Sequence, residues 1–230
     1  MSGDVKLELA RVDAGTFTMG ARDGENSYDE VPHQVTLTRG FYLGKTEVTQ
    51  AQWKAVMGNN PSLFLKGDDL PVEHVSWNDA MEFCEKLNSM GNAPKGWKFT
   101  LPTEAQWEYA ARGGNKSRRY KYSGSNDLGE VAWYDSNSGG KTHPVAAKRA
   151  NELGLYDMSG NVWEWCLDRY GSYSGDATDP TGPSDGRGRV RRGGGHMDGA
   201  IYCRSGRRAC NDPGDRYNDL GFRLALVPVQ

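Results

Sequence analysis

The sequence predicts an α+β fold with few short helices, short strands and much irregular backbone. The chain has 230 residues, of which 37% are hydrophobic, and this is enough to bury the core of one domain. Its 30 glycines and 10 prolines favour many loops over long helices. Seven tryptophans and eleven tyrosines supply core volume that aliphatic side chains do not. We therefore expect residues 1–230 to form a single domain.

Apolar patterns near the N-terminus predict strands and then a helix. Three strands are expected, at residues 17–20, 33–38 and 41–48. An exposed acidic loop, residues 23–30, separates the first two. Apolar residues then recur at helical spacing after Thr49, which forms a capping-box pattern with Gln52. A helix of modest length is therefore expected to follow Thr49.

Two further helices are predicted before the middle of the chain. Asn78 is expected to cap a helix with a buried apolar stripe, which ends near Gly91. Thr103 and Gln106 form the capping pattern of the next helix, and the run Arg-Gly-Gly that begins at Arg112 ends it. The glycine-rich residues 115–151 and 171–188 are then expected to be loops.

The third of these helices carries two glutamates that resemble a catalytic carboxylate pair. Glu104 and Glu108 are one helical turn apart, and Arg112 is one turn further on. This spacing favours ion pairs along the helix. We therefore interpret both glutamates as structural.

Residues 154–166 are the densest signal in the chain. Asp157 and Glu164 bracket a turn, Ser-Gly-Asn, whose carbonyl groups can bend toward a common point. Carboxylate and carbonyl oxygens are the ligands that Ca²⁺ prefers. The alternative is that the acids only stabilise the turn. Alternation from Val162 onward predicts a short strand with a half-buried pair, Trp163 and Trp165.

Residues 154–165, together with 100–114 and 218–223, resemble the formylglycine-generating-enzyme (sulfatase-modifying-factor) family, and the resemblance covers about residues 12–226. It implies the formylglycine-generating-enzyme-like variant of the C-type lectin fold. The family includes copper oxidases, iron-dependent sulfoxide synthases and non-catalytic binding proteins. In the resembling enzymes the matching turn carries a structural Ca²⁺. Here its ligands would be Asp157, Met158, Gly160, Val162 and Glu164, the middle three through carbonyl oxygens.

The resemblance also allows a test for catalysis. Copper-using members hold Cu(I) between two cysteines, and the alignment places the second at Cys203 but the first at Asp198. A hard carboxylate is a poor ligand for this soft ion, and the spacing does not favour Cys210 as a substitute. Sulfoxide synthases use histidines on an additional helical domain, whereas the four histidines here are scattered singly. Copper is therefore not expected, and a metal-dependent oxidoreductase is the alternative function.

Residues 196–217, within the C-terminal stretch 190–226, predict a binding surface. They mix aromatic, charged and small side chains with glycines and show no periodicity that would bury them. The stretch resembles the diversified segment of retroelement variable proteins, and many of its residues can be reached from an Asn codon by changing adenines. The alternative is an ordinary family member with a divergent loop. The candidate ligand-binding residues are His196, Met197, Asp198, Ile201, Tyr202, Gly206, Arg208, Cys210, Asp212, Asp215 and Tyr217.

Charge and composition indicate which kinds of partner to expect. The net charge of −2 gives no reason to expect nucleic acid or an anionic membrane, and the arginines of 187–192 are interpreted as a solvated loop and strand edge. No apolar run approaches the roughly 18 residues of a membrane helix. We expect a monomer that binds a protein or glycan. No targeting segment is evident, so we expect the cell surface if a leader precedes this sequence and the cytoplasm otherwise. Cys84 and Cys166 are expected in the core.

Overall fold

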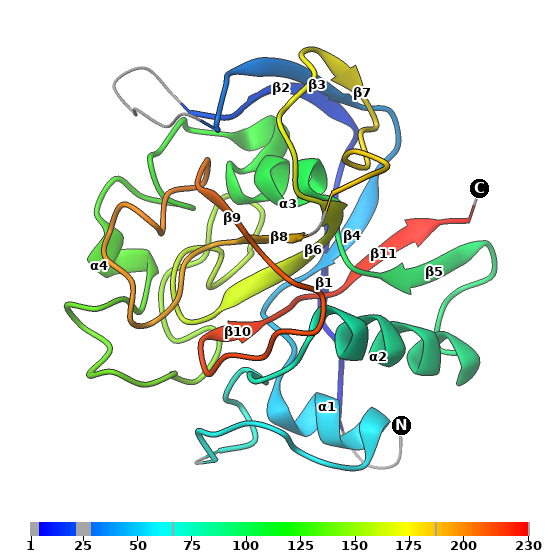
Figure 1. The fold of residues 1–230 in the computed structure, drawn as a ribbon, viewed down its shortest axis with the longest axis vertical. Coiled ribbons are helices and arrows are strands. Elements are labelled where there is room, and N and C mark those ends of the chain that lie inside the picture. The colour runs from blue at the N-terminus through cyan, green and yellow to red at the C-terminus, as the bar shows by residue number, and fades with distance from the viewer. Residues whose placement is uncertain (1–4, 22–28, 66, 187, 230) are drawn as a thin grey trace.

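The computed structural model describes residues 5–21, 29–65, 67–186 and 188–229, and these form short helices and strands joined by long irregular segments (Figure 1). The helices are α1 (Gln50–Met57), α2 (Trp77–Ser89), α3 (Glu104–Ala111) and α4 (Leu128–Val131), with a 3-10 turn η1 (Gly114–Lys116). The strands are β1 (Leu9–Val12), β2 (Gly15–Met19), β3 (His33–Leu37), β4 (Phe41–Gly44), β5 (Trp97–Thr100), β6 (Trp163–Arg169), β7 (Ala177–Thr178), β8 (Arg189–Arg192), β9 (Arg208–Asn211), β10 (Leu220–Gly221) and β11 (Ala225–Pro228).

Capping residues begin the three longer helices much as their sequences predict. Thr49 accepts the backbone N–H of Gln52 while the Gln52 side chain accepts the N–H of Thr49, and Thr103 and Gln106 repeat this arrangement on α3. On α2 the cap is Ser76 instead of the predicted Asn78. Ser76 completes a capping box with Asp79 three residues on, so the helix begins earlier than its apolar stripe indicates.

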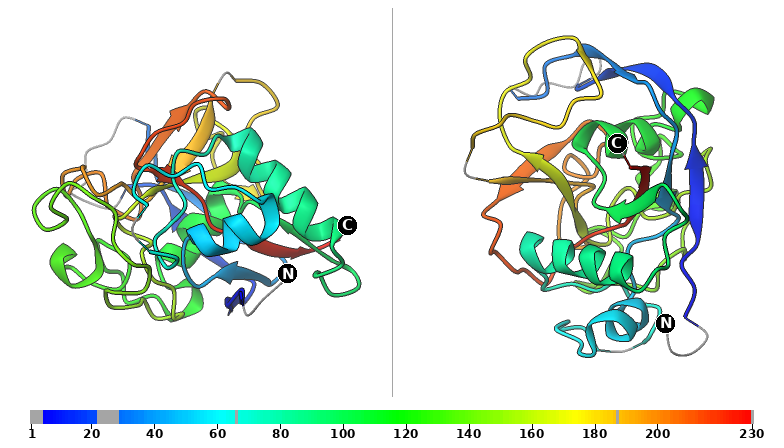
Figure 2. Two further views of the ribbon diagram at one scale, coloured as in Figure 1. Left: turned by 90° about the horizontal axis from the view of Figure 1, so that it is seen from below. Right: turned by 90° about the vertical axis from the view of Figure 1, so that its right-hand side faces the viewer.

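The described strands form three sheets, with the orders β1-β4-β11-β5, β10-β6-β8-β9 and β2-β3-β7. The third sheet lies at one end of the molecule above α3, while α1 and α2 lie together at the other end (Figure 2). Alternate apolar residues in 220–226 predict one closing strand, and this prediction is wrong. The first part of the segment is β10, parallel to β6, and its last part enters β11, between β4 and β5, so the segment crosses from one sheet to another.

Strand β6 runs through the centre of the protein and is buried on both faces. Trp163 and Trp165 are 2% and 0% exposed, so the predicted half-buried pair is a fully buried one. Glu164, on the opposite face, is also fully buried. The charge of Glu164 is met by Arg223, whose guanidinium donates to both carboxylate oxygens at 2.6 Å. The predicted core positions Cys84 and Cys166 are buried as well.

Buried ion pairs hold the second sheet to α3. Glu108 accepts hydrogen bonds from Arg112 and Arg192, and Glu104 accepts two from Arg208. The predicted ion pairing is therefore confirmed along the helix for Glu108 with Arg112, whereas Glu104 pairs with Arg208 of β9 instead. The interpretation of the basic run as solvated is wrong for Arg192, which is fully buried because it extends from β8 across the aromatic ring of Trp107 to α3.

The predicted acidic loop 23–30 coincides only partly with the described residues. Residues 22–28 lie outside them, so their exposure stays a prediction. Glu30, at the end of the loop, is fully buried in an ion pair with Arg204 at 2.9 Å. The prediction of exposure is wrong for this residue because a distant arginine neutralises its charge.

Candidate ligand-binding face and cation site

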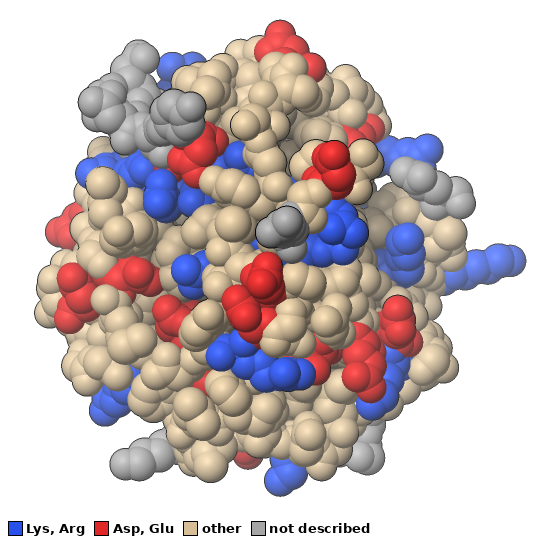
Figure 3. All heavy atoms as spheres, viewed as in Figure 1, with Lys and Arg blue, Asp and Glu red and all other residues tan. Residues whose placement is uncertain are grey.

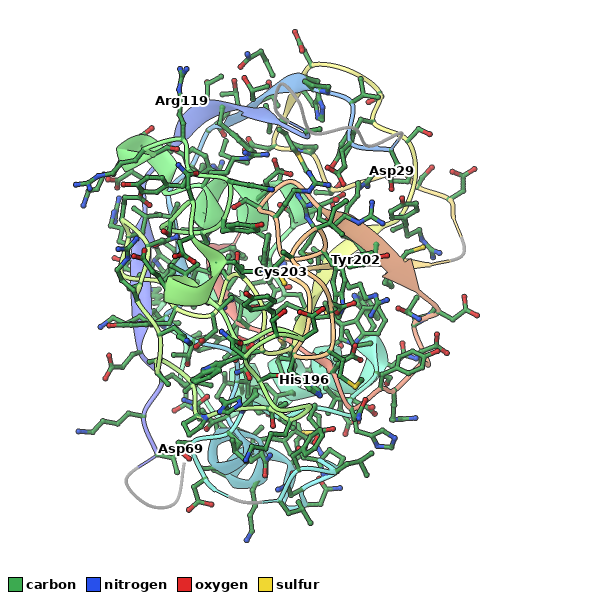
Figure 4. All side chains as sticks on the ribbon, turned by 90° about the vertical axis from the view of Figure 1, so that its left-hand side faces the viewer. Asp29, Asp69, Arg119, His196, Tyr202 and Cys203 are labelled. Carbon is green, nitrogen blue, oxygen red and sulfur yellow. The ribbon has the colours of Figure 1, made fainter. Side chains whose placement is uncertain are left out.

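The candidate binding residues lie on β9 and on the irregular segments that lead into and out of it. Four large apolar side chains among them are exposed: Met197 at 51%, Ile201 at 59%, Tyr202 at 41% and Tyr217 at 45%. We call these four residues the display face. Cys210 and Asp212 are also exposed, whereas Asp198 and Asp215 are partly buried. Figure 4 shows Tyr202 near the middle of one side of the molecule, above His196.

The prediction of exposure is wrong for His196, Gly206 and Arg208, which are buried. The His196 ring packs against Phe64 at a centroid distance of 5.3 Å. A Cβ at Gly206 would meet the carbonyl oxygen of Gly20 at 2.9 Å. A lack of periodicity therefore does not mean that every side chain of a segment is exposed, because loops that are distant in sequence can cover single side chains.

Buried arginines hold the backbone that carries the display face. Arg204 pairs with Glu30, and Arg208 donates to Glu104 at 2.7 Å and 2.8 Å and to the carbonyl of Gly171 at 2.7 Å. These are charge-assisted bonds made with low exposure. The exposed side chains therefore project from a segment that is tied to the scaffold.

A second apolar loop, which the sequence analysis missed, lies beside the display face. Leu63 and Leu65 are 61% and 65% exposed. Phe64 between them packs on His196, and the N–H of His74 donates to the carbonyl of Tyr217 at 2.9 Å. The signal was present in the run Leu-Phe-Leu, but only the folded chain shows which surface it joins.

Asp198 occupies the position that corresponds to the first copper cysteine, and its carboxylate accepts hydrogen bonds from neighbouring groups. Asp198 Oδ2 accepts hydrogen bonds from Trp163 Nε1 at 2.7 Å and from the N–H of Gly195 at 2.9 Å. Cys203 is fully buried, and burial raises the pKa of its thiol to about 12. At neutral pH it is a thiol, whereas copper binding needs the thiolate.

Three carboxylates and one arginine are buried together around the turn that follows Asp157. Glu164 is occupied by Arg223 and by Trp107 Nε1, which donates at 2.7 Å. Glu47, which the sequence analysis did not identify, accepts the N–H of Val162 at 3.1 Å. Burial raises the pKa of Asp157 to about 6 and that of Glu47 well above its ordinary value. Asp157 and Glu47 are thus buried beside the ion pair of Glu164 and Arg223. Burying these two acids in their charged form costs free energy unless a further cation is bound.

The donor set of this turn fits a hard cation in part. Asp157 Oδ1 is buried with no hydrogen-bond partner in the described structure. Within the same part of the chain, the carbonyl oxygens of Met158, Gly160 and Val162 accept no hydrogen bond. Unsatisfied buried oxygens of this kind suit Ca²⁺. Glu164 fits less well because Arg223 already covers both of its oxygens.

The described part of the chain has neither a cluster of metal-binding side chains nor a helix suited to a membrane. Among the described residues, no three His, Cys, Asp or Glu side chains group in a way that could hold a metal ion. A cation at Asp157 would therefore rely on backbone oxygens. No described helix has the length and apolar character needed to cross a membrane. Figure 3 shows acidic and basic side chains intermixed on one side of the molecule.

Comparison with known proteins places this geometry in a family. A model of the sulfatase-modifying factor enzyme 1-like domain matches residues 6–227. The chaperone protein LppX of Paenibacillus barcinonensis is 42% identical over 208 residues, which cover 70% of this chain and 71% of that protein. The formylglycine-generating enzyme of Thermomonospora curvata is 36% identical over 205 residues, 79% of this chain. The match covers 63% of the length of that enzyme.

Solved structures agree over nearly the whole chain. Treponema denticola variable protein 1 has a TM-score of 0.90 and 37% identity, with 99% of this chain and 98% of that one covered. PvdO from Pseudomonas aeruginosa has a TM-score of 0.80 and 25% identity, with 95% and 93% covered. These similarities confirm the predicted family and fold class, and they are compatible with both a binding protein and an enzyme.

Proposed function

We propose that this chain, which belongs to the sulfatase-modifying factor enzyme 1-like domain family, is a non-catalytic protein that binds a protein or glycan ligand through its display face. One observation carries the proposal: Met197, Ile201, Tyr202 and Tyr217 are exposed on a segment that buried arginines hold in place. Exposed apolar and aromatic side chains on a rigid support are typical of binding surfaces. The similarity to Treponema denticola variable protein 1 supports a role in display.

A change of four exposed residues to alanine tests this proposal. The variant Met197→Ala, Ile201→Ala, Tyr202→Ala, Tyr217→Ala should lose its ligand on protein and glycan arrays, because aromatic anchors dominate interfaces. Its free energy of unfolding should change by at most roughly 0.5 kcal/mol for each substitution. Met90→Ala with Val229→Ala, also exposed, is the control and should bind normally. Unchanged binding by the fourfold variant would contradict the proposal.

The proposal includes diversification of this surface by a retroelement. A reverse transcriptase gene nearby, with a near-copy of the 3′ end of the gene that differs mainly at adenines, would support it. If neither is present, the display face is the constant surface of an ordinary family member. The substitution experiment does not depend on this outcome, so binding and diversification are tested separately.

A structural Ca²⁺ at Asp157 is the second part of the proposal. Its removal by chelator should lower the melting temperature, because an ion at about 100 times its Kd stabilises by about 2.7 kcal/mol. Asp157→Asn keeps a residue that tolerates the left-handed φ of 56° but removes the charge, and it should weaken the calcium dependence. A melting temperature that ignores chelator after saturation with calcium would exclude the ion.

A further inference from the structure

Strand β2 forms one edge of the sheet β2-β3-β7, and the hydrogen bonds of β3 show which backbone groups point outward. The N–H of Gln34 donates to Asp176 at 2.8 Å, and the carbonyl of Thr36 accepts from Asp179 at 2.9 Å. Both groups therefore face β7. Backbone groups alternate in direction along a strand, so those of Val35 and its alternate neighbours face β2.

The register of the pair then fixes the direction of the β2 backbone. Phe17 is opposite Val35, so Phe17 bonds to β3 and the residues on either side of it face away. The ends of this outer edge agree with that assignment. Asn115 Nδ2 donates to the carbonyl of Ala14 at 2.9 Å, and the N–H of Gly20 donates to Glu108 Oε1 at 2.9 Å.

Thr16 and Thr18 lie between these two ends. Their outward N–H and C=O groups have no hydrogen-bond partner among the described residues. A row of unpaired groups of this kind is a template for another strand. Side chains already take the place of a partner strand at both ends, so the open part of the edge is short and has defined limits.

A groove of about 710 Å³ runs along this open edge. Its lining includes Thr16, Thr18, Tyr109, Asn115, Ser117 and Arg119. Figure 4 shows Arg119 beside the β2 ribbon, well separated from His196 and Tyr202. The groove is therefore a surface distinct from the display face.

One exposed cation, Arg119, lines the groove. Three more exposed cations lie close to Arg119 in the sequence, Lys116, Arg118 and Lys121, and we call these four residues the basic wall. None of them forms a salt bridge with a described residue, as judged from the ion pairs of that part of the chain. Among the described acids, Asp13 is paired with Arg11, and the side chains of Tyr120 and Glu152 raise the pKa of Arg118.

We propose that the edge of β2 at Thr16 and Thr18 binds an extended, acidic peptide segment of a partner protein as an added strand. The backbone of the segment would bond to the free groups of Thr16 and Thr18, and its acidic side chains would face the basic wall. Strand addition of this kind obtains affinity from the main chain and selectivity from neighbouring side chains. A second copy of this chain fits poorly, because its own basic wall would face the first one.

The probe is a short capped peptide of alternating Glu and Val, with a matched peptide that has Lys in place of Glu. In the free protein, the amide protons of Thr16 and Thr18 should exchange quickly with solvent. The acidic peptide should protect both amides and shift their NMR signals, and the basic peptide should not. Sedimentation should show a monomer throughout.

Two pairs of variants separate the backbone from the charge. Thr18→Pro removes the outward N–H without removing a backbone bond to β3, whereas Thr18→Val keeps that N–H. Both changes remove the hydrogen bond that Gln34 Nε2 donates to the Thr18 hydroxyl at 3.1 Å, so this loss cancels in the comparison. Lys116→Glu with Arg119→Glu reverses the basic wall, and Lys95→Glu with Lys98→Glu is the matched control on another surface. Thr18→Pro and the wall variant should each weaken the acidic peptide by about tenfold, and the two controls should not.

Three results would each overturn the inference. The first is protection of the Thr16 and Thr18 amides in the free protein, including protection by self-association. The second is equal binding of the acidic and basic peptides. The third is normal binding by the Thr18→Pro variant.

Discussion

Glu73 is a buried acid whose charge makes stability depend on pH. It is fully buried; its Oε1 accepts the N–H of Phe64 at 2.9 Å, and its Oε2 has no partner in the described structure. Burial raises the pKa of Glu73 to about 7. The folded pKa lies above the unfolded one, so the free energy of unfolding falls as pH rises between the two values. Above pH 7 this loss is complete.

Replacing Glu73 should remove that part of the pH dependence. Between pH 5 and pH 8, the free energy of unfolding should fall by roughly 2 kcal/mol more in wild type than in Glu73→Gln, since one pKa unit corresponds to about 1.4 kcal/mol. Urea denaturation at both pH values measures the difference. Glu82→Gln, on the exposed side of α2, should follow wild type. Parallel profiles for wild type and Glu73→Gln would show that Glu73 is ionised at no cost.

Two glycines with similar backbone conformations allow backbone strain to be distinguished from a steric clash of an added Cβ. Gly160 has a φ of 81°, and a Cβ there would lie 2.3 Å from the carbonyl oxygen of Trp133. Gly154 has a φ of 76° and open space around it. Gly154→Ala should cost about 1–2 kcal/mol from the left-handed backbone alone, and Gly160→Ala should cost clearly more. Similar thermal unfolding of the two variants would contradict the importance of the close approach.

At the residue scale, local signals could be read from the sequence and distant partners could not. Asp157 and the turn at Gly160 were recognised because their neighbours in sequence determine the turn. Glu47 was not, because it reaches the same cluster from a segment more than a hundred residues earlier. Exposure of His196 was predicted wrongly for the same reason, since Phe64 covers it.

At the scale of elements, helices followed their local sequence and strands did not. A capping box is complete within four residues, so α1 and α3 begin where predicted. Strand boundaries depend on partners, and residues 220–226 divide because β6 pairs with their start while β4 and β5 pair with their end. No period in a single segment contains that information.

The ion pair between β9 and α3 should contribute more to the free energy of unfolding than a similar pair on the surface. Arg208 is buried against Glu104, whereas Arg216 donates to Asp79 with 45% of its side chain exposed. Arg208→Met should destabilise by about 3–5 kcal/mol because Glu104 loses its bidentate partner in a buried site. Arg216→Met should cost at most about 1 kcal/mol. Guanidinium denaturation of both variants measures this, and equal costs would contradict the anchoring role of Arg208.

At the scale of the whole molecule, the fold and the chemistry vary independently. The fold was predictable because motifs spread over most of the chain resemble one family, and the TM-score of 0.90 to a variable protein at 37% identity agrees. Catalysis depends on a few residues of the site. An identity of 36% to a formylglycine-generating enzyme does not supply them.

We therefore expect no oxidation of cysteine to formylglycine by this protein. The carboxylate of Asp198 stands where the resemblance requires a thiolate, and it is held by Trp163 Nε1 and the N–H of Gly195. Cys203 alone is buried as a thiol and offers Cu(I) at most one soft ligand.

A sulfatase-type cysteine peptide incubated with the protein, Cu(I) and oxygen should be recovered unchanged by mass spectrometry, with the Thermomonospora curvata enzyme as the positive control. Asp198→Cys should raise Cu(I) affinity, since it restores the second thiol, without by itself producing turnover. Conversion of the peptide by wild type would make the metal-dependent oxidoreductase the better assignment and would leave the display face as a substrate-binding surface.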